Sequence, residues 1–205
     1  MWVGVLMLMA VALAVGACGH RPARPSSPAE RPAAGASDFA GAQVRQPAVF
    51  VRLNLGTGTF SEREREALGA AYEGALLEAL DRRGVPPRDA QLVSDARFDT
   101  RAALARAREV GADHAILVHV SIERGSRVFC RGRGRPFEAA VTVWEQSAQV
   151  IRASDGATRL SVTGSALTVS DLEPDCDTPR VSRRREGGET ASEAISRLLA
   201  RLLGS

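Results

Sequence analysis

The sequence predicts an α+β fold, with one mostly antiparallel sheet of about four strands and helices packed on it, preceded by a disordered tether. Three observations predict it. Hydrophobic residues make up 44% and charged residues 25% of the 205-residue chain, as in globular proteins. Residues 18–47 are rich in Pro, Ala, Ser and Arg without an apolar period, which is typical of an extended linker. Residues 48–205 alternate between strand-like and helix-like periods.

The first strand and helix are predicted by alternation followed by a capping signal. Residues 48–55 (AVFVRLNL) place apolar side chains at every second position. Ser61 and Glu64 have the spacing of a capping box, and a long amphipathic helix should follow them and end near Arg83, with Gly84 as its stop signal.

A second helix is expected at residues 100–110, and it should end at Gly111. It leads directly into the apolar run ADHAILVHVSI, which predicts a buried strand that ends near Ile122.

The segment 137–170 is expected to form two long strands joined at Asp155 and Gly156, because an Asp-Gly pair favours the type I′ turn. Its imperfect alternation suggests a β-bulge at residues 146–148. Thr190 and Glu193 predict the start of a last helix, whose apolar stripe should dock on the sheet.

The amino-terminal segment predicts export. Residues 1–17 contain no charged side chain and are too few for a permanent membrane span, so we interpret them as a signal peptide. Val15, Gly16, Ala17 and Cys18 resemble the lipobox of bacterial lipoproteins. This resemblance implies diacylglycerol on Cys18, cleavage before it and acylation, including palmitate, of the new amino terminus. The alternative is that Cys18 is a small residue at an ordinary cleavage site.

Gly19 follows the proposed anchor where some lipoproteins have Asp, which resembles lipoproteins of the outer membrane. We therefore expect the chain to be lipid-anchored on the periplasmic face of that membrane. In this oxidising compartment the remaining cysteines, Cys130 and Cys176, are expected to form a disulfide bond, since the predicted topology places both at one end of the sheet. The alternative is two separate buried thiols.

Charge and motif content argue against several functions. Acidic residues number 24 against 27 basic ones and aromatic content is 4%, so nucleic-acid binding is not indicated. His114 and His119 lie five positions apart and should face opposite sides of a strand, so a shared metal is not expected. His20 lies in the tether. No catalytic triad has a local signature, so we expect no enzyme activity, no cofactor and no metal.

The best candidate for binding a partner is a basic loop. Arg131, Arg133 and Arg135 alternate with glycine, and a second cluster at residues 183–185 precedes the last helix. A bridged pair of cysteines would bring the two clusters toward one end, where they could bind an acidic partner, a peptidoglycan carboxylate or a lipid phosphate. The alternative is a solvated loop.

The layout resembles that of envelope lipoproteins whose folded part is like the amino-terminal domain of TolB, including the penicillin-binding-protein activator and curli secretion-channel lipoproteins. The stretches that carry the resemblance are AVFVRLNL, LLEALDRRGV, ARAREVGADHAILVHVSI and VIRASDGATRLSVTGSA. The two paired cysteines and the Arg-rich loop depart from it. The resemblance implies a binding or scaffolding lipoprotein that contacts an envelope protein or the cell wall. The alternatives are an oligomeric secretion or assembly subunit that associates through its sheet edges, and a periplasmic enzyme. The sequence leaves the oligomeric state open.

Overall fold

The computed structural model describes residues 43–56, 59–94, 98–132 and 134–204. The predicted signal peptide and Cys18 lie outside the described residues, and so does Arg133. The α+β class predicted from the sequence is confirmed. Within the described residues, no helix is long and apolar enough to cross a membrane.

A six-stranded mixed sheet forms the centre of the fold, with the strand order β2-β1-β3-β4-β5 and β6 paired to β4. Its strands are β1 (Ala48–Leu55), β2 (Asp89–Leu92), β3 (His114–Phe129), β4 (Phe137–Arg152), β5 (Thr158–Val162) and β6 (Val169–Ser170). β1 runs parallel to β2 and β3, whereas β4 is antiparallel to β3, β5 and β6. β2 was not predicted from the sequence, because its four residues (DAQL) include no β-branched side chain and show no clear alternation.

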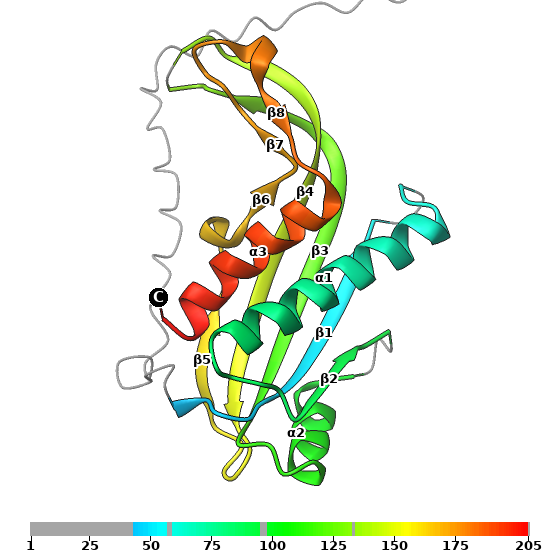
Figure 1. The fold of residues 1–205 in the computed structure, drawn as a ribbon, viewed down its shortest axis with the longest axis vertical. Helices are drawn as coiled ribbons and strands as arrows, with labels where there is room; N and C mark the ends of the chain where they lie inside the picture. The colour runs from blue at the N-terminus through cyan, green and yellow to red at the C-terminus, as the bar shows by residue number, and fades with distance from the viewer. Residues whose placement is uncertain (1–42, 57–58, 95–97, 133, 205) are drawn as a thin grey trace, which may run out of the picture. The chain divides into compact units, whose positions relative to one another are not determined.

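Two helices lie side by side across one face of the sheet (Figure 1): α1 (Glu62–Arg82) and α3 (Gly187–Leu202). The predicted capping box opens α1, since the Glu64 amide donates to the Ser61 hydroxyl at 3.3 Å and the Glu64 carboxylate accepts from the Ser61 amide at 2.8 Å. Gly84 follows the helix with a φ of +68°, a conformation that glycine adopts without strain. The start and stop signals of this helix are therefore confirmed.

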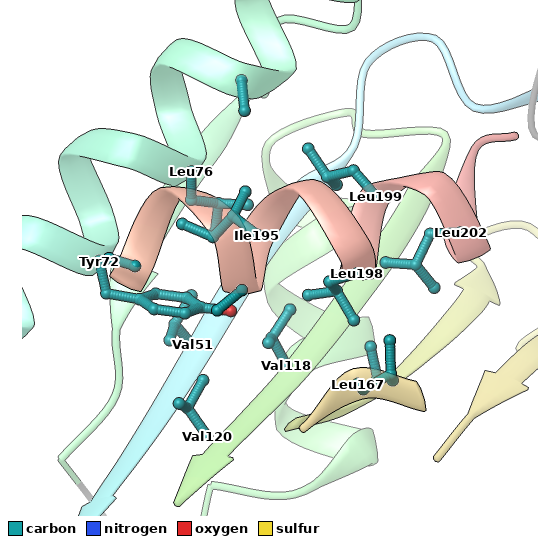
Figure 2. Packing of buried hydrophobic residues seen from close by; sticks show 14 of the residues in the cluster. Val51, Tyr72, Leu76, Val118, Val120, Leu167, Ile195, Leu198, Leu199 and Leu202 are labelled. Carbon is teal, nitrogen blue, oxygen red and sulfur yellow. The ribbon is translucent and has the colours of Figure 1, made fainter. Parts of the chain in front are cut away.

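The main core lies between these helices and the sheet. Figure 2 shows Tyr72 and Leu76 of α1 meeting Ile195 of α3, with Val51 and Val118 of the sheet beneath them. All five side chains are at most 3% exposed. The predicted apolar stripe of the last helix is part of this core.

One buried polar network crosses the core. The Tyr72 hydroxyl donates to Oε1 of Gln146 at 2.7 Å, and Nε2 of Gln146 donates to the carbonyl oxygens of Leu167 and Ala194. Burial raises the pKa of Tyr72, so the phenol stays a hydrogen-bond donor. The network joins α1, β4, the turn η3 (Ser165–Leu167) and α3, and because each of these groups is partnered it fixes their positions.

The opposite face of the sheet is only partly covered. α2 (Thr100–Glu109) packs there through Ala103 and Ala107, which meet Phe50 and Leu117 in a second core. Gly111 ends this helix with a φ of +68°, as predicted. Farther along β1 and β3, beyond α2, the side chains on this face become polar.

β3 and β4 continue together well past the rest of the sheet. All 16 residues of β3 pair with β4, but the pairing of β1 with β3 stops at Leu55 and Ile122. The strand was predicted to end near Ile122, and this boundary was wrong, because the mostly polar segment ERGSRVF is held extended by its pairing with β4. The last seven residues of β3, 123–129, and their partners in β4, 137–143, form a two-stranded ribbon. At about 3.3 Å per residue this ribbon is roughly 20 Å long. It curves away beyond α1 and α3 (Figure 1).

The predicted hairpin at Asp155 and Gly156 exists, but its turn type was wrong. Only Gly156 has a positive φ, whereas a type I′ turn needs two such residues. The connection is a longer loop, in which the Asp155 carboxylate accepts a hydrogen bond from the Ala157 amide. Asp side chains often bond to the backbone two residues on, and this contact stabilises the loop in place of a tight turn. The strand that follows, β5, stops at Val162, and the bulge lies at Val150 and Ile151 rather than at residues 146–148.

The last helix begins one turn earlier than predicted. Its capping box is formed by Glu186 and Glu189, which displaces the predicted box at Thr190 and Glu193. Thr190 lies inside the helix, where its hydroxyl donates to the Glu186 carbonyl oxygen at 2.9 Å. At the other end of the unit, Val44 is only 2% exposed and packs in the main core, within the segment predicted to be the tether.

Candidate partner-binding site

The structure joins Cys130 and Cys176 in a disulfide, with their Cα atoms 5.5 Å apart. Cys130 comes directly after β3 and has a φ of +61°, so it turns the chain out of the ribbon. Cys176 belongs to the segment that follows β7 (Leu172–Glu173). The bridge therefore ties this later segment to the end of the ribbon. We call the linked segments, residues 129–132, 134–137 and 173–181, the tip.

The tip is closely packed around the bridge. The Arg135 amide donates to the carbonyl oxygen of Cys176 at 3.4 Å. Gly134 has a φ of +74°, and a Cβ atom at this position would overlap the same carbonyl group. Glycine is thus required there both by its backbone conformation and by the close approach of the two segments.

The predicted basic loop lies in the tip, and its described arginines are accessible. Arg131 and Arg135 are exposed, and neither forms an ion pair with another residue in the described part of the chain. Acidic side chains of the tip, Glu173, Asp175 and Asp177, line a neighbouring hollow. The tip consequently offers both signs of charge, with the arginines on the loop that turns between β3 and β4.

The second predicted cluster, residues 183–185, has a structural role. Arg183 and Arg185 contact Glu173, and Arg184 forms an ion pair with Asp171 at 2.6 Å. Arg183 and Arg184 make up β8, which pairs with β7. This cluster is therefore less available to a partner than the loop arginines.

Asp171 anchors the returning segment to the sheet. Its amide donates to the Thr142 carbonyl oxygen at 3.0 Å, and its carboxylate accepts the Thr142 amide at 2.9 Å. The next residue, Leu172, is buried against Val141 and Val143 of β4. Asp171 was not predicted from the sequence, since an isolated Asp in a polar loop gives no local sign of this role.

A second candidate surface lies on the polar half of the sheet face beyond α2. The pairing registers place six side chains there in two rows, Arg52, His119 and Ser147 in one row and Asn54, Ser121 and Glu145 in the next. We call these six residues the polar face. They line a groove of about 870 Å³ together with the loops that carry Ser94 and Thr163. Its signal in the sequence was the polar side chains at alternate positions of β1 and β3.

His119 lies between Arg52 and Ser147 on this face. Partial burial, together with the positive charge of Arg52, lowers the pKa of His119, so the imidazole is neutral at neutral pH. His114 is 5% exposed and lies on the other face of the strand, as predicted. In the described part of the chain, no three His, Cys, Asp or Glu side chains are grouped to hold a metal ion.

The beginning of α1 is fastened to the base of the ribbon. Arg124 of β3 forms an ion pair with Glu64 at 2.7 Å and stacks over the ring of Phe60, with its guanidinium carbon 4.5 Å from the ring centroid. The Arg124 hydrogen bond and the capping contacts of Ser61 lower the pKa of Glu64 to about 2.

Comparison with known proteins yields structural likenesses only. No family model matches the sequence, and no curated protein matches it. A PelC dodecamer from Paraburkholderia phytofirmans is 16% identical with a TM-score of 0.41, over 82% of this chain and 95% of that one. A lipoprotein from Neisseria meningitidis is 10% identical with a TM-score of 0.35, over 78% and 100%. The carboxy-terminal domain of LpoB from Salmonella enterica is 15% identical with a TM-score of 0.28, over 63% and 85%.

Proposed function

We propose that the chain is an exported bacterial lipoprotein that presents its folded unit to another envelope protein or to the cell wall. Diacylglycerol on Cys18 holds it to the membrane, on the periplasmic face of the outer membrane as the neighbouring Gly19 suggests. Two or more acyl chains suffice for stable anchoring, whereas one is marginal. The bridge between Cys130 and Cys176 fits this location, because disulfides persist in oxidising compartments.

The observation that carries the binding role is the construction of the tip. A ribbon of two strands extends past the helices that cover the sheet, and a disulfide fixes its end. At that end Arg131 and Arg135 are exposed and make no ion pair with other described residues. Unpaired guanidinium groups on a fixed loop suit a carboxylate-bearing partner, since Arg binds carboxylates with two hydrogen bonds. We infer a binding role and not catalysis.

The anchoring half of the proposal is tested with Cys18→Ser. Envelopes carrying the native chain and this variant are treated with a crosslinker, and captured partners are compared after membrane fractionation. We expect the native chain in the outer-membrane fraction and the variant to remain unprocessed or leave that fraction. If both forms are processed and held by the membrane identically, the lipoprotein assignment is wrong.

The binding half is tested at the tip by the double variant Arg131→Ala and Arg135→Ala. The matched control is Arg101→Ala with Arg201→Ala, which removes the same charge from exposed positions on α2 and α3. We expect the tip variant alone to lose its crosslinked partner, with the loss reduced at high salt concentration because screening already weakens the contact. Equal capture by the two variants would place the partner's site elsewhere.

A further inference from the structure

The ribbon has one strand edge that nothing pairs within the described residues. β1 covers the outer edge of β3 only as far as Ile122, and Gly56 donates its amide to the Ile122 carbonyl oxygen at 3.2 Å. Backbone groups alternate sides along a strand, so the amides and carbonyls of Arg124, Ser126 and Val128 point to this same outer edge. We call residues 123–129 the free edge.

The free edge is both ordered and accessible. Its inner side pairs with β4 along its whole length, which holds it extended. Residues 123–128 are all exposed, and Val128, 41% exposed, is one of few large apolar side chains in the described structure with this exposure. Open edges of this length are templates for the addition of another strand.

We propose that the free edge pairs with the free edge of a second copy of this chain, antiparallel and around a two-fold axis at Ser126. In this register Ser126 faces its own copy, Arg124 faces Val128 and Gly125 faces Arg127. Glu123 faces Phe129, so the seven residues of one strand match the seven of the other. This inference goes beyond the proposed partner-binding function and does not depend on it.

The charges of the strand select this register. Glu123 lies diagonal to Arg127 of the second copy on one face of the extended sheet, and the symmetry makes this contact twice. Arg127 also lies diagonal to its own copy, once, and this repulsion is offset by Glu145 of the same chain, which lies 3.9 Å from Arg127. Gly125, which has open space where a Cβ would be, leaves room for the long side chain of the opposing Arg127. A shift that centres the axis on Arg127 or on Arg124 would instead place like charges directly opposite each other, which is unfavourable.

Steric limits exclude the remaining neighbouring register. An axis at Gly125 would bring Val128 opposite Ile122, whose outer edge is already occupied by β1 and Gly56. The strand also ends where the pairing ends, because Cys130 turns away with its φ of +61°. Two seven-residue strands form an interface smaller than the roughly 1,000 Å² typical of stable complexes, so the dimer should be weak and concentration-dependent.

Disulfide trapping in the full-length chain tests the register. Cα atoms of a directly opposed hydrogen-bonded pair lie about 5.5 Å apart, within the range that a disulfide spans. We expect Ser126→Cys to give a covalent dimer on non-reducing gels of envelopes. Val128→Cys is the matched control, exposed on the same edge but roughly 13 Å from its own copy in this register. No dimer with Ser126→Cys, or equal dimer with both variants, would overturn the proposal.

Variants that keep the monomer intact provide an independent measurement. Ser126→Pro removes an amide that faces the outer edge and not β4, so the monomer should fold while dimerisation is lost. Glu123→Arg and Arg127→Glu should each weaken the dimer about fivefold, and the double reversal should restore it because the pair forms again. Sedimentation of the full-length chain in mild detergent measures these changes. Association unaffected by Ser126→Pro, or a double reversal weaker than both single ones, would refute the pairing.

Discussion

Removal of the disulfide should cost the protein a large part of its stability. Cys130 and Cys176 are separated by 46 residues. Closing a loop of this length in the unfolded chain removes conformational entropy worth about 4 kcal/mol at 25 °C on the chain-entropy treatment. Because a typical domain is stable by only about 5–15 kcal/mol, the double variant Cys130→Ser with Cys176→Ser should remain folded but with a small margin.

Urea unfolding followed by circular dichroism measures this difference. With a slope of about 2 kcal/mol per molar urea, the transition midpoint should fall by about 2 M. The oxidised protein treated with reductant is the control, and it should unfold at the same midpoint as the double variant. A loss below about 1 kcal/mol would show that the tip segments remain close together in the unfolded state or that the bridge does not form.

Three further outcomes follow from single positions. Gln146→Leu should lower the free energy of unfolding by about 1–3 kcal/mol, because the buried Tyr72 hydroxyl loses its acceptor. A double-mutant cycle with Tyr72→Phe, measured by urea unfolding, should show that the two losses are not additive. Glu64→Gln should reduce stability at neutral pH, and this loss should vanish as pH falls from about 4.5 to 2. The reason is that a carboxylate with a lowered pKa stabilises the fold only while it is ionised. Melting temperatures of both proteins measured across this pH range test the prediction. Gly134→Ala should lower the melting temperature and raise the rate at which reductant opens the disulfide, because the added Cβ displaces the Cys176 carbonyl group. An unchanged melting temperature and reduction rate would contradict the packing of the tip.

Helix ends were predictable where a local signal had no competitor. Ser61 with Glu64 and the glycines at 84 and 111 define α1 and α2 as the sequence indicated. The start of α3 was missed because two overlapping capping patterns exist, and the earlier one, at Glu186, gains a turn of helix across a Gly-Gly pair. Choosing between them depends on packing, since Thr190 and Ala191 are buried in the core.

The sheet was less predictable because its extent depends on long-range pairing. Residues 123–129 have the composition of a loop, yet they form a strand because β4 pairs with them. The return through Asp171 joins positions 29 residues apart in sequence, and no local pattern marks such a contact. The polar face likewise arises only when β1, β3 and β4 are placed in register. The predicted loop arginines, in contrast, were visible as a Gly-Arg alternation.

The disulfide should matter most for the part of the ribbon that no helix covers. A two-stranded ribbon alone is marginally stable in water, so residues 123–129 depend on Leu172, Asp171 and the bridge for their order. In the reduced protein, amides of residues 123–129 should therefore exchange faster than those of residues 115–122, because the ribbon can open locally whereas the strand held between β1 and β4 opens only with global unfolding. Hydrogen exchange read by mass spectrometry on the oxidised and reduced protein separates the two segments. Equal protection of the two segments in the reduced protein would mean that the ribbon opens only together with the whole domain, as one cooperative unit.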